Sequence, residues 1–337
     1  MPRAHPSVPQ TRVALIGAGL VGAGWAIVFA RAGLEVVVYD EQAAQRQRLP
    51  GWVSRQLSDL QAEGLLHEPP AVIAARIRLV SSLEAALEGV DFVQESIVER
   101  LEVKQRLYAA MDALAAPGTI LASSTSAFPT SAIAEGLAGR ARCIVAHPVN
   151  PPYLVPLVEV SGAPFTAPAT VERTLALMRA VGQAPIHVRR EIHGFVLNRL
   201  QWTLLAEACR LVEAGIASID DVDAAIRDGL GRRWAFIGPF EVGDLNAPAG
   251  LGDYLQRFAP TIEAINAPSA EGPFQLHPGN VAALHAARRE LLPEAQREAR
   301  MAWRDRRLMA LAAHLATAAR QQTDEDSPGA TRSMPPT

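Results

Sequence analysis

A histidine and a glutamate near the middle of the chain have surroundings typical of an acid–base pair. His147 opens the proline-rich stretch over residues 147–153, and Glu159 lies in the apolar run Leu-Val-Glu-Val over residues 157–160. An imidazole ionises near neutral pH, so it can take the proton of a hydroxyl group as an alcohol is oxidised. A neighbouring carboxylate fixes the tautomer of the ring and stabilises its charged form. An unpaired carboxylate among apolar residues is costly, which makes His147 its natural partner, although the spacing fits a structural loop histidine equally well.

A glycine-rich motif near the N-terminus predicts a dinucleotide-binding turn. Gly17, Gly19 and Gly22 fit G-x-G-x-x-G between an expected strand and an expected helix, and Asp40 closes the next expected strand. The first glycine permits the tight turn, the second admits the pyrophosphate, and the third lets helix and strand pack closely. Asp40 would accept hydrogen bonds from ribose hydroxyls and repel a 2′-phosphate, so we expect NAD over NADP. The alternative is a glycine-rich turn that binds no ligand.

Two further polar residues lie where a ligand could meet them. Ser126 ends the run Ser-Ser-Thr-Ser, which follows an expected strand at the edge where open parallel sheets bind ligands. The alternative for this run is an N-cap of the helix near Pro129. Asn198 is a polar residue on the otherwise apolar first turn of a long expected helix. Its alternative is an amide that bonds to a neighbouring backbone group.

Alternating strands and helices are expected to position these residues. The pattern predicts a parallel sheet with crossover helices, a Rossmann-type doubly wound α/β fold over residues 1–190. A helical excursion over 42–66, with a break at Pro50-Gly51, follows the second strand. Long Ala/Leu/Arg-rich stretches then predict an all-α domain over 191–320, followed by a disordered tail over 321–337. The expected strands are 12–16, 35–39, 77–80, 91–94, 119–122, 143–146, 157–160 and 185–188.

Composition narrows the class of protein. Hydrophobic residues make up 49% and charged residues 20%, as in ordinary globular chains, and the net charge of −3 offers no basic field for nucleic acid or an anionic membrane. Two cysteines, Cys143 and Cys209, make a disulfide framework or a metal cluster improbable, so no metal is expected. The uncharged run over 13–30 is interrupted by glycines, which favours strand–turn–helix over a membrane span, and residues 1–11 lack a secretory core. We expect a cytoplasmic protein.

Taken together, these motifs resemble those of the 3-hydroxyacyl-CoA dehydrogenase family, and most closely its lambda-crystallin or L-gulonate 3-dehydrogenase branch. The resemblance covers nearly the whole chain apart from its two ends. It is carried by Ser126 and by the stretches GAGLVGAG over 17–24, HPVNPPYLVPLVE over 147–159 and GFVLNRL over 194–200, with further similarity at Gln94-Glu95, Gly215-Ile216, Gly229–Gly231 and Ala235–Pro239.

The resemblance implies a role for each candidate residue. His147 is the catalytic base, Glu159 is its partner, and Ser126 and Asn198 hydrogen-bond the reacting oxygen. NAD-contacting positions, beyond the three glycines, are Leu20, Val21, Asp40, Glu99, Lys104 and Asn150. Lys104 is the single lysine among 32 lysine and arginine residues, which supports a functional role for it. The resemblance also implies a homodimer formed through the C-terminal helical domain.

The implied reaction is reversible NAD-dependent oxidation of a 3-hydroxyl group to a 3-oxo group. Residues 41–70 hold three arginines against four acidic residues, a balance that does not attract a multiply charged CoA tail. We therefore expect a small, L-gulonate-like 3-hydroxy acid as substrate, with Arg233 clamping its carboxylate; the alternative is that Arg233 is a solvated surface residue.

Other functions stay open from the sequence. They are a 3-hydroxyacyl-CoA dehydrogenase, a carnitine 3-dehydrogenase and a crystallin-type structural protein without turnover. The β-hydroxyacid dehydrogenases use a catalytic lysine from the helical domain, and no lysine follows Lys104 here.

The cofactor preference can be tested at Asp40. Asp40→Ser or Asp40→Arg should erode the preference for NAD, because a carboxylate that repels the 2′-phosphate is removed. The measurement is kcat/KM with NAD and with NADP for each variant. Equal use of both cofactors by the wild type would contradict the placement of Asp40 at the ribose.

Overall fold

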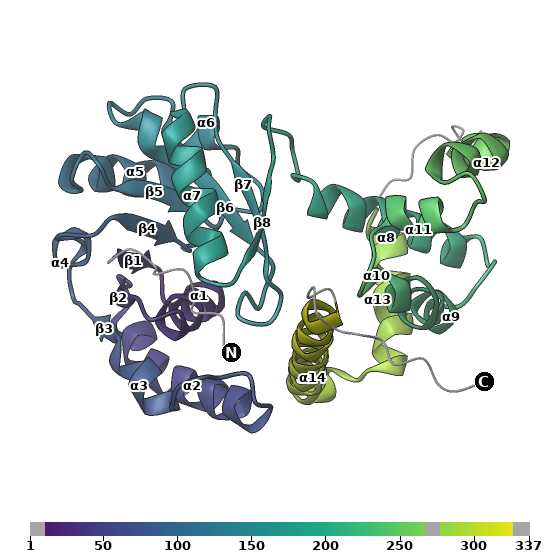
Figure 1. Cartoon of the computed structure of the whole chain (residues 1–337), viewed down its shortest axis with the longest axis horizontal. Helices are drawn as coiled ribbons and strands as arrows, with labels where there is room; N and C mark the ends of the chain where they lie inside the picture. Colours follow the sequence, from purple (N-terminus) through teal and green to yellow (C-terminus); the bar gives the residue numbers. More distant parts are fainter. Residues whose placement is uncertain (1–10, 267–276, 326–337) are drawn as a thin grey trace. The chain divides into compact units, whose positions relative to one another are not determined.

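The computed structural model describes residues 11–266 and 277–325, which form two compact units (Figure 1). The first unit contains the chain through Arg199 and again from Ala299 onward, and the second is Leu200–Glu298. The sequence placed the division at 190 and assigned everything to residue 320 to the helical domain. The last long helix instead groups with the first unit.

An eight-stranded sheet in the order β3-β2-β1-β4-β5-β6-β7-β8 forms the centre of the first unit. The expected Rossmann-type α/β sheet followed by a helical region is confirmed. Each strand agrees with its expected range to within two residues. The strands are β1 (Arg12–Ile16), β2 (Glu35–Tyr39), β3 (Ile77–Leu79), β4 (Phe92–Glu95), β5 (Ile120–Ser123), β6 (Cys143–Pro148), β7 (Leu157–Ser161) and β8 (Ala184–His187).

Helices cover both faces of this sheet, because the central strands bury side chains on both sides. In β1, Val13 and Leu15 belong to one buried cluster, whereas Ala14 and Ile16 belong to the other. The first cluster takes side chains from α1, α2 and α7, and the second from α4, α5 and α6. These helices are α1 (Leu20–Arg31), α2 (Ala43–Ala62), α3 (Pro70–Ala75), α4 (Leu83–Leu87), α5 (Leu101–Leu114), α6 (Thr130–Ala134) and α7 (Pro168–Ala180), with a short 3-10 turn η1 (Arg140–Arg142).

The helical excursion after β2 is continuous, so the expected break at Pro50-Gly51 is wrong. Helix α2 runs through Pro50. A proline inside a helix removes one backbone hydrogen bond and introduces a steric clash. Here a stripe of buried leucine and valine continues on both sides of it, and burying that stripe offsets the loss. The buried residues of α2 are Leu49, Val53, Leu57 and Leu60.

The sheet is parallel except at one pair of strands. β7 runs antiparallel to β6, and β8 is parallel to β7. The connection over 149–156 is too short for a crossover helix, and antiparallel strands can be joined by a short loop. The register of this pair sets His147 directly opposite Glu159.

The second unit is helical throughout its described residues. Helix α8 (Leu197–Glu213) begins in the first unit and continues into the second. It is followed by α9 (Ile219–Ala224), a π-helical turn η2 (Ala225–Leu230), α10 (Gly231–Trp234), α11 (Pro239–Leu245), α12 (Leu251–Asn266), α13 (Pro278–Leu291) and a 3-10 turn η3 (Glu294–Gln296).

Helix α14 (Arg297–Glu325), yellow in Figure 1, packs Met309 into the buried cluster that holds Leu49 and Val53 of α2. It extends through the first residues of the expected tail, and the rest of that tail, 326–337, lies outside the described residues. Among the described helices none has the length and apolar character needed to cross a bilayer.

The second and third glycines of the nucleotide motif, Gly19 and Gly22, can be tested separately because they meet different surroundings. A Cβ at Gly22 would lie 1.9 Å from the carbonyl oxygen of Gly17, whereas at Gly19 it would meet no protein atom within 4 Å. We expect Gly22→Ala to lower Tm by roughly 5 °C or more, because a backbone oxygen cannot easily give way. Gly19→Ala should keep the wild-type Tm and bind NADH more weakly, since its methyl group would lie where the pyrophosphate approaches. Thermal melts and NADH titrations measure this, and equal thermal losses would contradict it.

Candidate active site

A buried pair of side chains joins β6 and β7. His147 Nδ1 lies 2.9 Å from Glu159 Oε2, and Glu159 is fully buried while His147 is 7% exposed. With Nδ1 held by the carboxylate, the second ring nitrogen, Nε2, is the one available as a base. The structure thus brings together the two residues whose pairing the sequence left open.

The same carboxylate also holds the start of helix α8. Glu159 Oε1 accepts hydrogen bonds from the backbone N–H of Val196, at 2.8 Å, and of Leu197, at 2.9 Å. Burial alone would raise the pKa of Glu159, but the bonds from His147, Leu197 and Val196 outweigh it, and the pKa lies below its usual range. Glu159 therefore stays ionised at neutral pH while it binds a cation-forming ring and a helix N-terminus.

Asn198 and Ser126, two candidates far apart in sequence, also meet. Asn198 Nδ2 donates to the carbonyl oxygen of Ser126 at 3.5 Å, and Asn198 is 8% exposed. This contact uses the backbone carbonyl of Ser126 and does not involve its hydroxyl group. Through Val196 and Leu197, the carboxylate of Glu159 thus fixes the helix turn that carries Asn198.

Phe195 is a site residue that the sequence reasoning missed. Its ring centroid lies 5.5 Å from that of His147, and its side chain is 1% exposed. Phe195 has a φ of 48° and follows Gly194, whose φ is 76°. The left-handed conformation costs a non-glycine residue such as Phe195 about 1–3 kcal/mol. The Gly-Phe step before an apolar helix start was the only sequence signal for it.

Lys104 lies inside the protein, between two carboxylates. The side chain is 1% exposed, and Nζ lies 2.8 Å from Glu95 Oε1 and 3.1 Å from Glu99 Oε2. Glu95 is fully buried, whereas the side chain of Glu99 is 36% exposed. In this arrangement the carboxylate of Glu99 is the partly exposed member of the cluster, and the ammonium group of Lys104 lies between the two carboxylates.

The glycine-rich turn leaves backbone N–H groups at the start of α1 without a side-chain cap, so they can bind an anion. The carboxylate of Asp40 accepts the N–H of Ala18 and of Gln42, each at 2.8 Å. Each oxygen keeps a further lone pair for a ribose hydroxyl. Helix α1 has Gly19 as its N-cap without a side-chain cap, so its first N–H groups remain available to a pyrophosphate. These features fit the cofactor that the motif predicts.

The remaining expected cofactor contacts lie at the surface of the first unit. Leu20, at the first position of α1, is 66% exposed, Val21 is half-buried, and Asn150, two residues after β6, is exposed. An exposed leucine at the start of a helix whose N–H groups await an anion is suited to contact with a bound dinucleotide.

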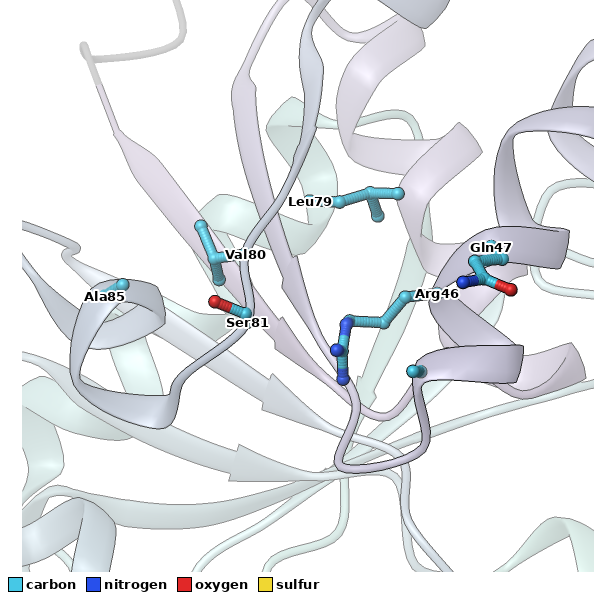
Figure 2. A pocket seen from close by; sticks show the side chains of 7 residues that line it. Arg46, Gln47, Leu79, Val80, Ser81 and Ala85 are labelled. Carbon is cyan, nitrogen blue, oxygen red and sulfur yellow. The ribbon is translucent and has the colours of Figure 1, made fainter.

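A pocket of about 470 Å³ opens beside Asp40 and was not expected from the sequence (Figure 2). Figure 2 shows Arg46 and Gln47 of α2 on one side and Val80, Ser81 and Ala85 on the other. The guanidinium of Arg46 donates to the backbone carbonyl of Asp40. The pocket therefore adjoins Asp40, the residue expected to bind the adenosine ribose.

Comparison with known proteins identifies the family. The model of the 3-hydroxyacyl-CoA dehydrogenase NAD-binding domain matches residues 12–192, and that of the C-terminal domain matches residues 194–268. The chain belongs to the 3-hydroxyacyl-CoA dehydrogenase family. It is accordingly an oxidoreductase of the NAD-dependent kind, as the glycine motif and Asp40 predicted.

Relatives within the 3-hydroxyacyl-CoA dehydrogenase family include proteins with different names. A lambda-crystallin homolog of Bos taurus is 43% identical over 89% of this chain and 94% of its own length. An L-carnitine dehydrogenase of a Pseudomonas species is 39% identical over 74% of this chain and 77% of its own. The solved structure of an NAD+-dependent 5-formyl-3-hydroxy-2-methylpyridine 4-carboxylic acid 5-dehydrogenase has a TM-score of 0.68 at 30% identity, covering 85% of this chain and 97% of that one.

The ionisation of Glu159 predicts an acid-dependent stability. Its pKa in the folded protein is lowered, so its contribution to stability is complete above the ordinary glutamate pKa and is lost as pH falls through the folded value. We expect Glu159→Gln to be less stable than wild type at pH 7 and the difference to shrink towards pH 3, in urea titrations at each pH. Glu191→Gln, which removes a carboxylate that binds the N–H of Ser131, is the control. A pH-independent difference for Glu159→Gln would contradict the pairing.

Proposed function

We propose that this protein oxidises the 3-hydroxyl group of a small L-3-hydroxy acid, of the L-gulonate type, to the 3-oxo acid with NAD, and that the reaction is reversible. The observation that carries the proposal is the continuous hydrogen-bonded set from His147 through Glu159 to the turn of Asn198, and from Asn198 to Ser126. It joins a base, its orienting carboxylate and two oxygen-binding side chains in one unit of the fold.

The roles follow from the chemistry of these groups. NAD, when bound, supplies the hydride acceptor. Nε2 of His147 takes the hydroxyl proton of the substrate, and the carboxylate of Glu159 stabilises the resulting imidazolium. The hydroxyl of Ser126 and the amide of Asn198 hydrogen-bond the reacting oxygen and orient C3 for hydride transfer. In the reverse direction, His147 returns the proton to the oxygen.

The charges around α2 support a small substrate over an acyl-CoA. Arg46 is engaged with Asp40, and Arg76 forms a bidentate pair with Glu68 at 2.6 and 2.7 Å. Gln56 of α2 accepts the hydroxyl of Tyr153 at 2.9 Å. Arg46 and Arg76 are therefore engaged within the protein, and the excess of acidic residues over 41–70 offers little to a CoA phosphate.

A carboxylate clamp is assigned to Arg233 from the family resemblance. It is exposed on α10 of the second unit, and neighbouring Arg232 is paired with Asp228 at 3.4 Å. Within the described residues no acidic side chain pairs with Arg233, which leaves its guanidinium group available to a substrate carboxylate.

A homodimer through the helical domain is proposed as well, supported by apolar side chains exposed there, such as Phe240 at 74% and Ile216 at 70%. We also propose a cytoplasmic location.

Two other substrates and one non-catalytic role compete with this proposal. The family description favours an acyl-CoA thioester, and the Pseudomonas relative favours carnitine. A crystallin-type structural role is suggested by the Bos taurus relative. The assembled His147, Glu159, Ser126 and Asn198 argue against a protein without turnover.

A substrate panel tests the proposal. NADH absorbance is followed with gulonate, carnitine, 3-hydroxybutyrate and 3-hydroxybutyryl-CoA, and we expect the highest kcat/KM with a free polar hydroxy acid. His147→Gln should lower kcat by about 10² to 10⁴-fold while NADH affinity is kept, because the base is lost and the nucleotide site is untouched. Efficient turnover of 3-hydroxybutyryl-CoA alone would refute the substrate class, and turnover near wild type in His147→Gln would refute the mechanism.

A further inference from the structure

The single lysine of the chain occupies an enclosed position that suits a compact ammonium group. Lys104 is 1% exposed, and its Nζ donates to Glu95 Oε1 at 2.8 Å, to Glu95 Oε2 at 3.1 Å and to Glu99 Oε2 at 3.1 Å. An ammonium group has three donors around one compact atom, whereas a guanidinium is a larger planar fork. In a chain whose other basic residues are all arginine, this enclosed site between two carboxylates is where lysine remains.

The first carboxylate, Glu95, anchors the ammonium group to the sheet. Besides Lys104, it accepts the hydroxyl of Ser123 at 2.6 Å and the N–H of Ile97 at 2.6 Å. It lies at the end of β4 and is fully buried. The position of the Lys104 ammonium is thus fixed by two neighbouring strands, β4 and β5.

The second carboxylate, Glu99, connects the fixed ammonium group to the loop that carries Ser126. Its Oε2 pairs with Lys104, and its Oε1 accepts the hydroxyl of Thr125 and the backbone N–H of Ser126 and of Ala127, each N–H at 3.1 Å. Burial would raise the pKa of Glu99, but the bonds from Thr125 and the charge of Lys104 lower it below its usual range. Glu99 therefore remains an ionised acceptor beneath the loop.

We propose that Lys104 is a positioning residue for catalysis: its buried ammonium group holds Glu99, and Glu99 fixes the backbone of Ser126 so that its hydroxyl meets the reacting oxygen. The proposal rests on the proposed function for the role of Ser126. It differs from a direct cofactor contact, because Lys104 is enclosed, and from a merely structural ion pair, because one partner of the pair binds the catalytic loop itself.

The test uses a charge-balanced variant. Lys104→Met alone would leave Glu95 buried without a cation, a change that can unfold a protein. The double variant Glu95→Gln/Lys104→Met removes both buried charges and leaves Glu99 without its ammonium partner. Lys104→Arg keeps the positive charge but alters its shape. The control is Arg142→Met, which breaks a mostly buried ion pair of 2.7 Å between Arg142 and Asp112. Asp112 lies on α5, the helix that carries Lys104, but the pair does not contact Ser126.

Kinetics give the first readout. With the best substrate of the panel, we expect the double variant and Lys104→Arg to lose about 10- to 100-fold in kcat, the cost of a small misplacement at a reacting centre. KM should stay within about twofold, because no contact to the hydroxy acid is removed, and the Kd for NADH should rise by less than the fall in kcat. Arg142→Met should melt at a lower temperature and keep the wild-type kcat.

Amide hydrogen exchange gives a second readout that does not depend on turnover. The N–H groups of Ser126 and Ala127 should exchange on the order of tenfold faster in the double variant, as expected on weakening a hydrogen bond to a charged acceptor. Arg142→Met should keep wild-type protection in the peptide over 122–128.

The outcomes separate the alternatives. Wild-type kcat and protection in the double variant would show that Lys104 serves stability alone, and a tenfold weaker Kd for NADH at unchanged kcat would show that it binds the cofactor; either result overturns the proposal. If the wild type oxidises no 3-hydroxy acid, the proposed function fails, and the exchange of the Ser126 and Ala127 amides alone decides whether Lys104 positions this loop.

Discussion

The site depends on one buried carboxylate. Glu159 reaches His147 across the β6–β7 pair with one oxygen and the backbone of Val196 and Leu197 with the other. A carboxylate taken out of water must have its oxygens hydrogen-bonded, and these partners provide the bonds from two separate segments of chain. Because a rotation of this group would break its bonds to both segments at once, the imidazole of His147 and the turn that carries Asn198 are fixed relative to each other.

A second carboxylate, that of Glu99, holds the loop of Ser126 in place, as the carboxylate of Glu159 holds the ring of His147. Glu99 binds the loop of Ser126 through N–H groups and the hydroxyl of Thr125, and its other oxygen is held by Lys104. In both cases burial disfavours the charge, and directed hydrogen bonds restore it. The polar groups that would act on a substrate are thus supported by ionised side chains within the fold, which keeps them ordered before a substrate arrives.

Backbone conformation contributes to the same order. Phe195 adopts a left-handed φ immediately before α8 and places its ring beside that of His147. The conformation is costly for a non-glycine residue and is held by the burial of the ring and by the two amides bound to Glu159. The turn that begins α8 therefore positions Asn198 and also packs the ring of Phe195 against the imidazole of His147.

The sequence by itself determined the elements whose signals are local. The strand–turn–helix–strand from Arg12 to Tyr39 follows from apolar runs, three glycines and an acidic residue at fixed offsets, and it agrees with the structure nearly residue by residue. Family motifs carried the candidate residues His147, Ser126 and Asn198. Local signals failed at Pro50, where burial of a leucine stripe on both sides of the proline outweighs its cost.

Only the tertiary structure decided which of these residues touch. Twelve positions separate His147 from Glu159, and that spacing is compatible with a loop histidine as much as with a pair; the antiparallel register of β6 and β7 makes them neighbours. The burial of Lys104 could not be predicted from the sequence either, because a single lysine gives no local signal of whether its ammonium group faces solvent or two carboxylates. The physical reason is that register and burial are set by how whole strands and helices pack, over distances that no short stretch of sequence encodes.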